Sequence, residues 1–568
     1  MGNLRPILFM GLLLLAYMMW VEWQKDYGSA PQPSPPRSDM SPAGQDLPAA
    51  PSLAEGAGGD TVPEDLPAPE AGATPAPTAE SAARGAPDKP LVTVRTDVLE
   101  LGIDPVGGTV VSALLLDYPV EQKVPDVVVS LLEPSGDRMF IAQSGLLSQN
   151  EAPNHTSSYR AERDAYRLEP GGGDLEVPLV WESGDGLKVT KTFLFRAGRY
   201  DIEVRYRVEN GSAATWTGSR YDQLQRTVPG DEESAGFTQP ERYSFFGVGF
   251  YNPQDKFEKI QFDDVADEPY RKTSTEGWLA MIQHYFFAAW IPPAAEQATF
   301  TTQAITGGGW PRYIARTVSP ARQVASGSEA EFSSVLYLGP KLQDDIPDIA
   351  AGLEYTVNYG IFTVFSKPLF WLLEKIHDVV GNWGWAIVLL TVLIKAAFFK
   401  LTEAQYRSTA RMRKLQPRIE QLKERFGDDR QRMSQAMMEL YKKEKVNPLG
   451  GCLPILVQIP IFIALYWVLL ESVELRQAPF ILWIDNLSVR DPYFVLPLLN
   501  AAFMFATQRL TPMVGMDPLQ QKMMTAMPIV FSIMFAFFPA GLVLYWATNA
   551  GLSLAQQYYI TRKIAAAD

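Results

Sequence analysis

Residues 453–470 read LPILVQIPIFIALYWVLL, an apolar run without a charged residue. A run of this length and composition is typical of an α-helix that crosses a membrane. Four more apolar stretches lie in the same part of the chain, at Trp383–Phe399, Tyr493–Gln508, Met523–Phe538 and Leu542–Ile560. The sequence therefore predicts five membrane-spanning helices in the C-terminal part of the chain.

Composition alone hides this pattern. The 568 residues have a mean hydropathy of −0.06 and a net charge of −14, but residues 400–447 hold 13 Lys and Arg against 7 Asp and Glu. The single cysteine, Cys452, excludes an internal disulfide framework and Cys-rich metal sites, and the three histidines lack metal-ligand spacing. The sequence has no GxxxxGK[ST] phosphate loop. No metal, cofactor, catalytic residue or enzymatic activity is predicted.

The first 27 residues carry a further apolar run from Ile7 to Val21, with Arg5 before it and Trp20 and Trp23 at its end. A cleaved signal peptide is one interpretation, but no small-x-small cleavage site directly follows the run. The tryptophans favour an uncleaved transmembrane anchor at residues 1–27 with a cytoplasmic N-terminus.

Two regions separate this anchor from the five predicted spans. Residues 28–90 hold 14 of the 44 prolines and predict a disordered linker. Residues 91–350 contain alternating stretches such as Leu187–Phe195 and Tyr200–Val208, separated by Gly and Asn turns. This pattern predicts a large all-β sandwich on the outer side of the membrane. No cluster of carboxylates or histidines in it indicates catalysis.

A short helix is predicted before the spans, within residues 351–381. Leu369, Leu373 and Ile376 fall on one face of it, which is typical of a helix that lies in the membrane interface. The positive-inside rule then places 400–447 in the cytoplasm and predicts six spans with both termini cytoplasmic.

Residues 402–446 predict a cytoplasmic helical hairpin. Thr402–Gln405 form a capping box that would open the first helix, and Met412, Leu415 and Ile419 continue as a heptad seam. The outer surface would be basic, which favours contact with anionic lipid headgroups, with ribosomal RNA and a targeting factor, or with both. The residues concerned are Arg407, Arg411, Arg413, Lys414, Arg418, Lys423, Arg425, Arg430, Arg432, Lys442, Lys443 and Lys445.

Lys395 lies four residues before the end of the predicted span Trp383–Phe399. It would either snorkel towards Lys400 or face a water-filled concavity within the membrane. Neighbouring spans contain polar residues that would form separate interhelical hydrogen bonds or together wet such a cavity. These residues are Thr391, Gln458, Asn500, Ser532, Thr548, Asn549 and Ser553.

Several motifs resemble one known family. NPLGGC at residues 447–452 is similar to the YidC/Oxa/Alb membrane protein insertases. VELRQAPF at 473–480, GLVLY at 541–545, GWLAM at 277–281 and AWIP at 289–292 resemble the Gram-negative members. The resemblance covers nearly the whole chain, and only the linker at residues 28–90 falls outside it.

This resemblance implies a five-helix core with a hydrophilic groove, open to the cytoplasm and the lipid, in a multi-pass protein of the bacterial inner membrane with a large periplasmic domain. The oligomeric state stays open, with a monomer as one alternative. It implies an insertase and chaperone that works without nucleotide hydrolysis, alone or with the Sec translocon. Its implied partners are nascent membrane proteins, the Sec translocon, the ribosome with signal-recognition-particle machinery, and anionic lipids.

The family's positive groove residue maps to Lys395, where relatives commonly have Arg, and a threonine one turn earlier maps to Thr391. An aromatic pair maps to Tyr545 and Trp546, where a second Tyr would be expected. Lys400 stands where proline is common, and the end of the chain, residues 564–568, lacks a long basic tail.

Two other functions fit parts of the sequence. A small-solute transporter would use the same polar residues, but the five spans show no inverted repeat. A membrane anchor that displays a carbohydrate-binding β domain would lose its function if residues 28–340 were removed.

Overall fold

The computed structural model describes residues 90–134, 136–169, 171–228, 244–306, 310–426, 429–444, 453–510 and 518–565. All of them fall within one compact unit of the chain. The predicted anchor at 1–27 and nearly all of the predicted linker at 28–90 lie outside the described residues.

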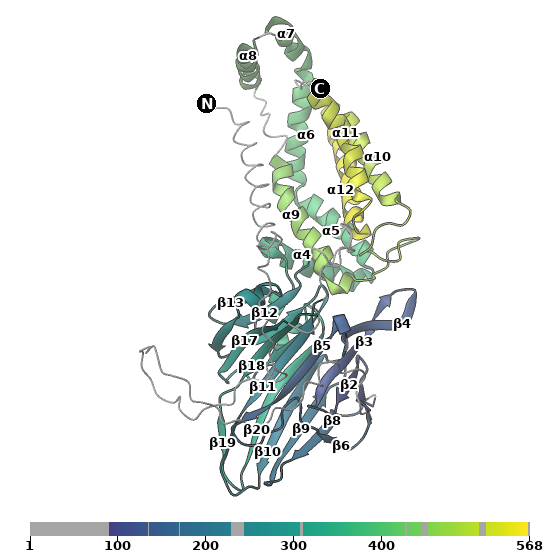
Figure 1. The fold of residues 1–568 in the computed structure, drawn as a ribbon. Helices are drawn as coiled ribbons and strands as arrows, with labels where there is room; N and C mark the ends of the chain where they lie inside the picture. The colour runs from purple at the N-terminus through teal and green to yellow at the C-terminus, as the bar shows by residue number, and fades with distance from the viewer. Residues whose placement is uncertain are drawn as a thin grey trace, which may run out of the picture. The chain divides into compact units, whose positions relative to one another are not determined.

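Eleven strands form the first of two large sheets (Figure 1). They are β1 (Val92–Arg95), β2 (Leu99–Asp104), β3 (Thr109–Glu121), β4 (Val124–Leu132), β5 (Phe140–Ser148), β7 (Ala165–Arg167), β11 (Trp216–Thr227), β14 (Arg271–Ser274), β17 (Ala298–Ile305), β18 (Arg312–Val318) and β19 (Arg322–Val324). The strand order is β14-β17-β18-β11-β5-β3-β2-β1-β7, with β4 paired to β3 and β19 to β11.

Nine strands form the second sheet, in the order β13-β12-β15-β16-β20-β10-β9-β8-β6. They are β6 (Arg160–Ala161), β8 (Leu175–Glu182), β9 (Leu187–Phe195), β10 (Asp201–Asn210), β12 (Gly247–Asn252), β13 (Lys256–Gln261), β15 (Trp278–Ile282), β16 (Phe286–Ile291) and β20 (Glu329–Pro340).

The sequence pattern explains how these sheets bury their side chains. β9 alternates buried and half-buried residues along most of its length, as expected for a strand with one face on the core. β15 and β16 are buried at every position, which matches their continuous apolar sequences WLAMI and FFAAWI. Residues of both sheets share one hydrophobic core, which confirms the predicted large β-sandwich domain.

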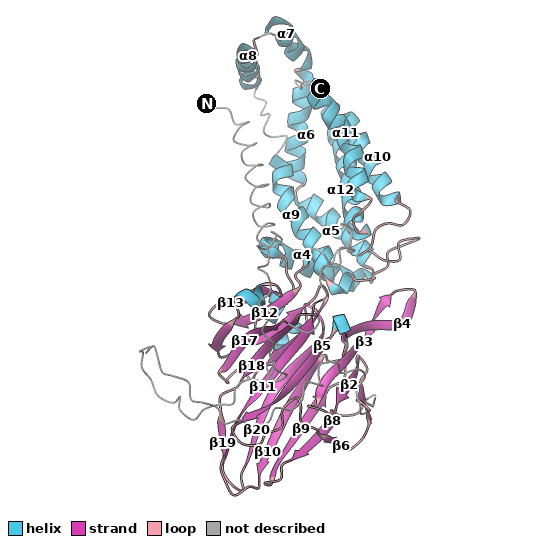
Figure 2. Cartoon of the chain, viewed as in Figure 1, coloured by secondary structure: helices cyan, strands magenta, loops and turns pink. Residues whose placement is uncertain are grey.

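The remaining elements are mostly helical, as Figure 2 shows. The main helices are α4 (Thr363–Val380), α5 (Trp383–Ala397), α6 (Phe399–Lys414), α7 (Gln416–Phe426), α8 (Arg430–Lys443), α9 (Leu453–Glu471), α10 (Val495–Leu510), α11 (Pro518–Phe535) and α12 (Ala540–Ala565). Short helices occur at α2 (Asp264–Asp267) and α3 (Ile346–Ile349), and single 3-10 turns at Gly136–Arg138, Leu353–Thr356, Gly360–Phe362 and Val473–Leu475.

Within the described residues, no helix taken alone has both the length and the hydropathy expected of a membrane span. The pair formed by α5 and the start of α6, Trp383–Ala397 with Phe399–Met412, meets both criteria together and bends by 62° at the break. A shorter apolar helical stretch covers Val457–Glu471.

Two details of the predicted hairpin differ from the structure. α6 begins at Phe399, and the amide of Thr402 is bonded to the carbonyl of Phe398 at 3.0 Å. Thr402 is therefore inside the first turn, and the predicted capping box is wrong. The expected single first helix is divided into α6 and α7 at Leu415, because Pro417 lacks the amide that would continue the hydrogen-bond ladder.

Candidate functional site

The break between α5 and α6 determines where the candidate site lies. Asn382 caps α5 by accepting a hydrogen bond from the amide of Trp385 at 3.0 Å. Gly384 lies so close to Phe480 that a Cβ atom would be 2.0 Å from the ring. α5 ends at Ala397, so Lys395 occupies its last turn and is directed towards α12.

Lys395 is buried, with 8% of its surface exposed, and its Nζ lies 2.8 Å from the Ser553 hydroxyl. Ser553 donates in turn to the Asn549 carbonyl at 2.7 Å, and the Tyr406 hydroxyl donates to the Ser553 carbonyl at 3.2 Å. Lys400, in contrast, has 92% of its side chain exposed and lies 3.8 Å from Glu403. The ammonium of Lys395 is therefore held between helices and not extended beside Lys400.

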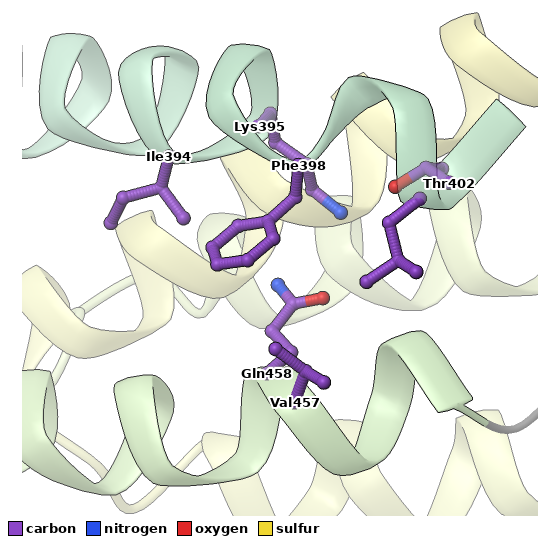
Figure 3. A pocket seen from close by; sticks show the side chains of 7 residues that line it. Ile394, Lys395, Phe398, Thr402, Val457 and Gln458 are labelled. Carbon is purple, nitrogen blue, oxygen red and sulfur yellow. The ribbon is translucent and has the colours of Figure 1, made fainter.

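A second polar contact adjoins the first. Gln458 of α9 donates from Nε2 to the Asn549 side chain of α12 at 2.8 Å. A small cavity of about 10 Å³, roughly the space that one water molecule needs, lies between α5, α6 and α9. Figure 3 shows the side chains around it, which are Ile394, Lys395, Phe398, Leu401, Thr402, Val457 and Gln458.

An aromatic group continues along α12. The ring of Phe462 lies 6.2 Å from that of Tyr545 and 4.5 Å from that of Trp546, which also contacts Phe535 at 5.1 Å. In the described part of the chain, the Trp546 indole nitrogen has no hydrogen-bond partner, and the buried Tyr545 hydroxyl lies beside the Gln458 side chain. A buried, unpaired donor is costly unless another group reaches it.

The other predicted groove residues are not joined to this cluster. Thr391 donates to the Ile387 carbonyl of its own helix at 2.7 Å, and Thr548 is half-buried. The buried side-chain oxygen of Asn500, Oδ1, has no partner among the described residues. Ser532 donates to the Pro497 carbonyl at 2.9 Å and so ties α11 to α10.

Sequence reasoning missed the cavity-lining role of Thr402 and the contact of Tyr406. Both depend on the sharp bend at Phe398, for which the sequence gives no clear signal.

The helical hairpin of α6, α7 and α8 has its own small core. Leu415 and Ile419 are buried, and Met412, Met437, Leu440 and Tyr441 pack against them. Of the predicted basic residues, Arg407, Arg411, Lys414, Arg418, Arg425, Arg432, Lys442 and Lys443 are exposed. Arg407 pairs with Glu403 at 2.7 Å, Arg418 with Glu444 at 2.5 Å and Arg432 with Asp429 at 3.3 Å. Lys445 and the side chains of Arg413, Lys423 and Arg430 lie outside what the structure describes.

Buried polar groups connect the β domain to the end of α9. Lys341 Nζ lies 3.9 Å from the Glu471 carboxylate, which also accepts from Ser244. The His284 ring contacts the Leu470 carbonyl through Nε2 at 2.9 Å. Burial lowers the pKa of Lys341 to about 8 and that of His284 to about 3. His284 is therefore neutral at neutral pH and serves as a hydrogen-bond donor.

Just after α9, the carboxylate of Glu474 accepts a hydrogen bond from the backbone amide of Gln343 at 3.1 Å. Burial raises the pKa of Glu474 to about 7. Among the described residues, no group of three or more His, Cys, Asp and Glu could hold a metal ion.

Comparison with known family models defines the class of protein, which is an inner membrane protein with a periplasmic domain. Residues 91–372 match the family model for the YidC periplasmic domain, and residues 375–567 match that for the 60Kd inner membrane protein. The chain belongs to the YidC family of membrane protein insertases, a family without enzymatic activity. This confirms the predicted family, its class of function and its location.

Two full-length relatives show the extent of this similarity. The membrane protein insertases YidC of Thioalkalivibrio sulfidiphilus and Methylococcus capsulatus are each 48% identical to the chain, and each match covers 99% of both proteins. A crystal structure of an active YidC insertase is 20% identical, covers 83% of this chain and 94% of that one, and superposes with a TM-score of 0.38.

Proposed function

We propose that this insertase receives the polar flank of a nascent membrane protein beside Lys395, within a hydrophilic groove formed by α5, α9 and α12. The observation that supports this most is the buried ammonium of Lys395 with Ser553 as its side-chain partner. Gln458, Asn549, the Tyr545 hydroxyl and the unpaired indole nitrogen of Trp546 extend the polar surface along α12. These groups would replace part of the hydration that the substrate loses.

The energetic argument concerns the polar part of the substrate. An unsatisfied polar group in hydrocarbon costs several kcal/mol, so hydrogen bonds from the groove lower the barrier for its passage. The apolar span then leaves along the lipid-facing side, at roughly −0.3 to −0.6 kcal/mol for each Leu, Ile, Phe or Val. Neither step needs nucleotide hydrolysis.

The same proposal assigns a role to each of the other parts of the chain. We assign residues 1–27 to an anchor, 28–90 to a linker, 91–350 to the periplasmic domain and 351–381 to an interfacial helix. Residues 382–568 form the insertase core, including the hairpin at 402–446. The exposed basic side chains of this hairpin favour contact with the ribosome, signal-recognition-particle machinery and anionic lipids. The protein would act as a monomer, alone or beside the Sec translocon.

The test uses purified full-length protein in nucleotide-free liposomes and a two-span substrate with a short polar loop. Insertion is scored by protease protection for wild type, Lys395→Arg, Lys395→Gln and Lys395→Ala, with Lys400→Ala as a matched control because Lys400 is exposed. If charge matters, Lys395→Arg keeps insertion while Lys395→Gln and Lys395→Ala reduce it by about tenfold, the equivalent of 1.4 kcal/mol.

Equal insertion by the Arg and Gln variants would refute the role of charge. Equal insertion by wild type and Lys395→Ala would make Lys395 a structural residue. Insertion no higher than in empty liposomes would contradict the proposed unaided mechanism.

A further inference from the structure

The hairpin of β3 and β4 extends beyond the neighbouring strands of its sheet (Figure 1). β3 pairs with β2 only as far as Leu115, opposite Leu99, but continues to Glu121. β4 then returns beside it, with Val124 opposite Glu121 and Val128 opposite Pro119. The end of the hairpin is thus a two-stranded ribbon.

The outer edge of β4 is open along this ribbon. Among the described residues, the backbone of Val124–Ser130 has β3 as its strand partner on one side and no strand on the other. Backbone pairing towards β5 occurs only after β4 has ended, at the bridge between Glu133 and Phe140. An open edge presents unpaired N–H and C=O groups, and these can pair with another extended chain.

The side chains of the ribbon are unusually apolar for an exposed edge. Val120, Val124 and Val127 have 50%, 44% and 53% of their surface exposed. Lys123, Pro125 and Asp126 protect the turn and the start of β4, because charge and proline discourage pairing where they occur. The stretch Val127–Ser130, which begins with three consecutive valines, is left without such protection.

The ribbon is also fixed next to the helical region. Arg476 donates to the Pro119 carbonyl at 2.8 Å, and Gln477 donates to the carbonyls of Pro119 and Val120 at 3.0 Å each. Both residues follow the 3-10 turn Val473–Leu475, which comes after α9, the helix that carries Gln458. The ribbon is therefore tied, through β3, to the segment that follows a helix of the proposed groove.

We propose that the open edge of β4 binds an extended, uncharged segment of the polypeptide that the insertase has just moved to the periplasmic side, as an added strand. This inference rests on the proposed function, which supplies an unfolded chain at this place. The chain's own residues 28–90 are a poor occupant, because their 14 prolines lack the amides that a paired strand needs.

A photo-crosslinking residue at Val127 tests the proposal in the full-length protein in liposomes. A matched probe at Thr273 lies on β14, the edge strand at one end of the same sheet, and is also exposed. The substrate has two spans and a translocated loop rich in Val and Thr, and a second substrate has proline at alternate loop positions. We expect the Val127 probe to label the first loop at least about fivefold more than the Thr273 probe, and the proline loop to lose this excess.

Equal labelling from both probes, equal labelling of both loops, or adducts only with a second copy or with residues 28–90 would overturn the proposal. Protease protection of the substrate spans is scored in the same samples. Protected spans without a Val127 adduct overturn this inference alone. Unprotected spans in every sample overturn the insertase mechanism, and the strand-addition proposal with it.

Discussion

At the scale of single residues, Lys191 of β9 combines full burial with a polar role. Its Nζ donates to the carbonyls of Gly108 at 2.7 Å, Gly107 at 3.1 Å and Ser144 at 3.4 Å. Burial lowers the pKa of Lys191 from 10.5 to about 7. Between these values the unfolded chain binds more protons than the folded one, so this residue makes stability rise with pH.

We therefore expect the free energy of unfolding to increase from about pH 7 to about pH 10, by up to roughly 1.4 kcal/mol per pH unit from this group. Lys191→Met should remove that slope and also destabilise the fold by about 1–3 kcal/mol, because buried carbonyls lose their donor. Denaturant titrations of the full-length protein in detergent at several pH values measure both effects. The same slope in wild type and Lys191→Met would show that the lysine titrates normally in the fold.

At the scale of elements, the start of α5 depends on a close approach. The missing Cβ of Gly384 allows Phe480 to contact the helix backbone, and Asn382 fixes the same loop by donating to the carbonyls of Pro479 and Phe480 at 3.2 Å each. Gly384→Ala should therefore displace Phe480 and destabilise the protein by about 1–3 kcal/mol, as overpacking does.

Thermal unfolding of Gly384→Ala should begin at a lower temperature than that of wild type. Gly184→Ala is the matched control, because an added Cβ there would meet nothing within 4 Å. Similar unfolding temperatures for the two variants would mean that Phe480 moves aside without cost.

These elements differ in how much of their structure the sequence predicts. β9 alternates in burial along most of its length, and α9 is a long apolar run. Both patterns are local, so the residues alone predict that β9 is a strand and α9 a helix. The bend between α5 and α6 depends on helices packed from elsewhere, and Thr402 therefore lies inside a helix that local capping rules would have begun at that residue.

For the candidate site, the sequence indicates several of the residues but not the contacts between them. The sequence suggests Lys395 as unusual because a lysine in an apolar span is costly, and it suggests Gln458 and Asn549 as polar residues at the same depth. It does not indicate that Lys395 meets Ser553, 158 positions later, or that Gln458 meets Asn549. Those pairings follow from how α12 packs against α5 and α9.

At the scale of the whole molecule, the β domain and the end of α9 share a buried ion pair. Lys341 and Glu471 have 1% and 0% of their side chains exposed. Removing one member of such a pair leaves a buried charge and typically costs about 3–5 kcal/mol. Removing the whole β domain instead exposes Glu471 to water, where it needs no partner.

We therefore expect a single substitution to damage the protein more than a large deletion. Lys341→Met should lower the unfolding temperature of the full-length protein, and Lys341→Met combined with Glu471→Gln should recover part of the loss. A variant without residues 28–340 should still insert the two-span substrate in liposomes. If that variant is folded, as judged by its helical circular dichroism, and inserts nothing, then the β domain carries the function, as expected of an anchor that displays a binding domain.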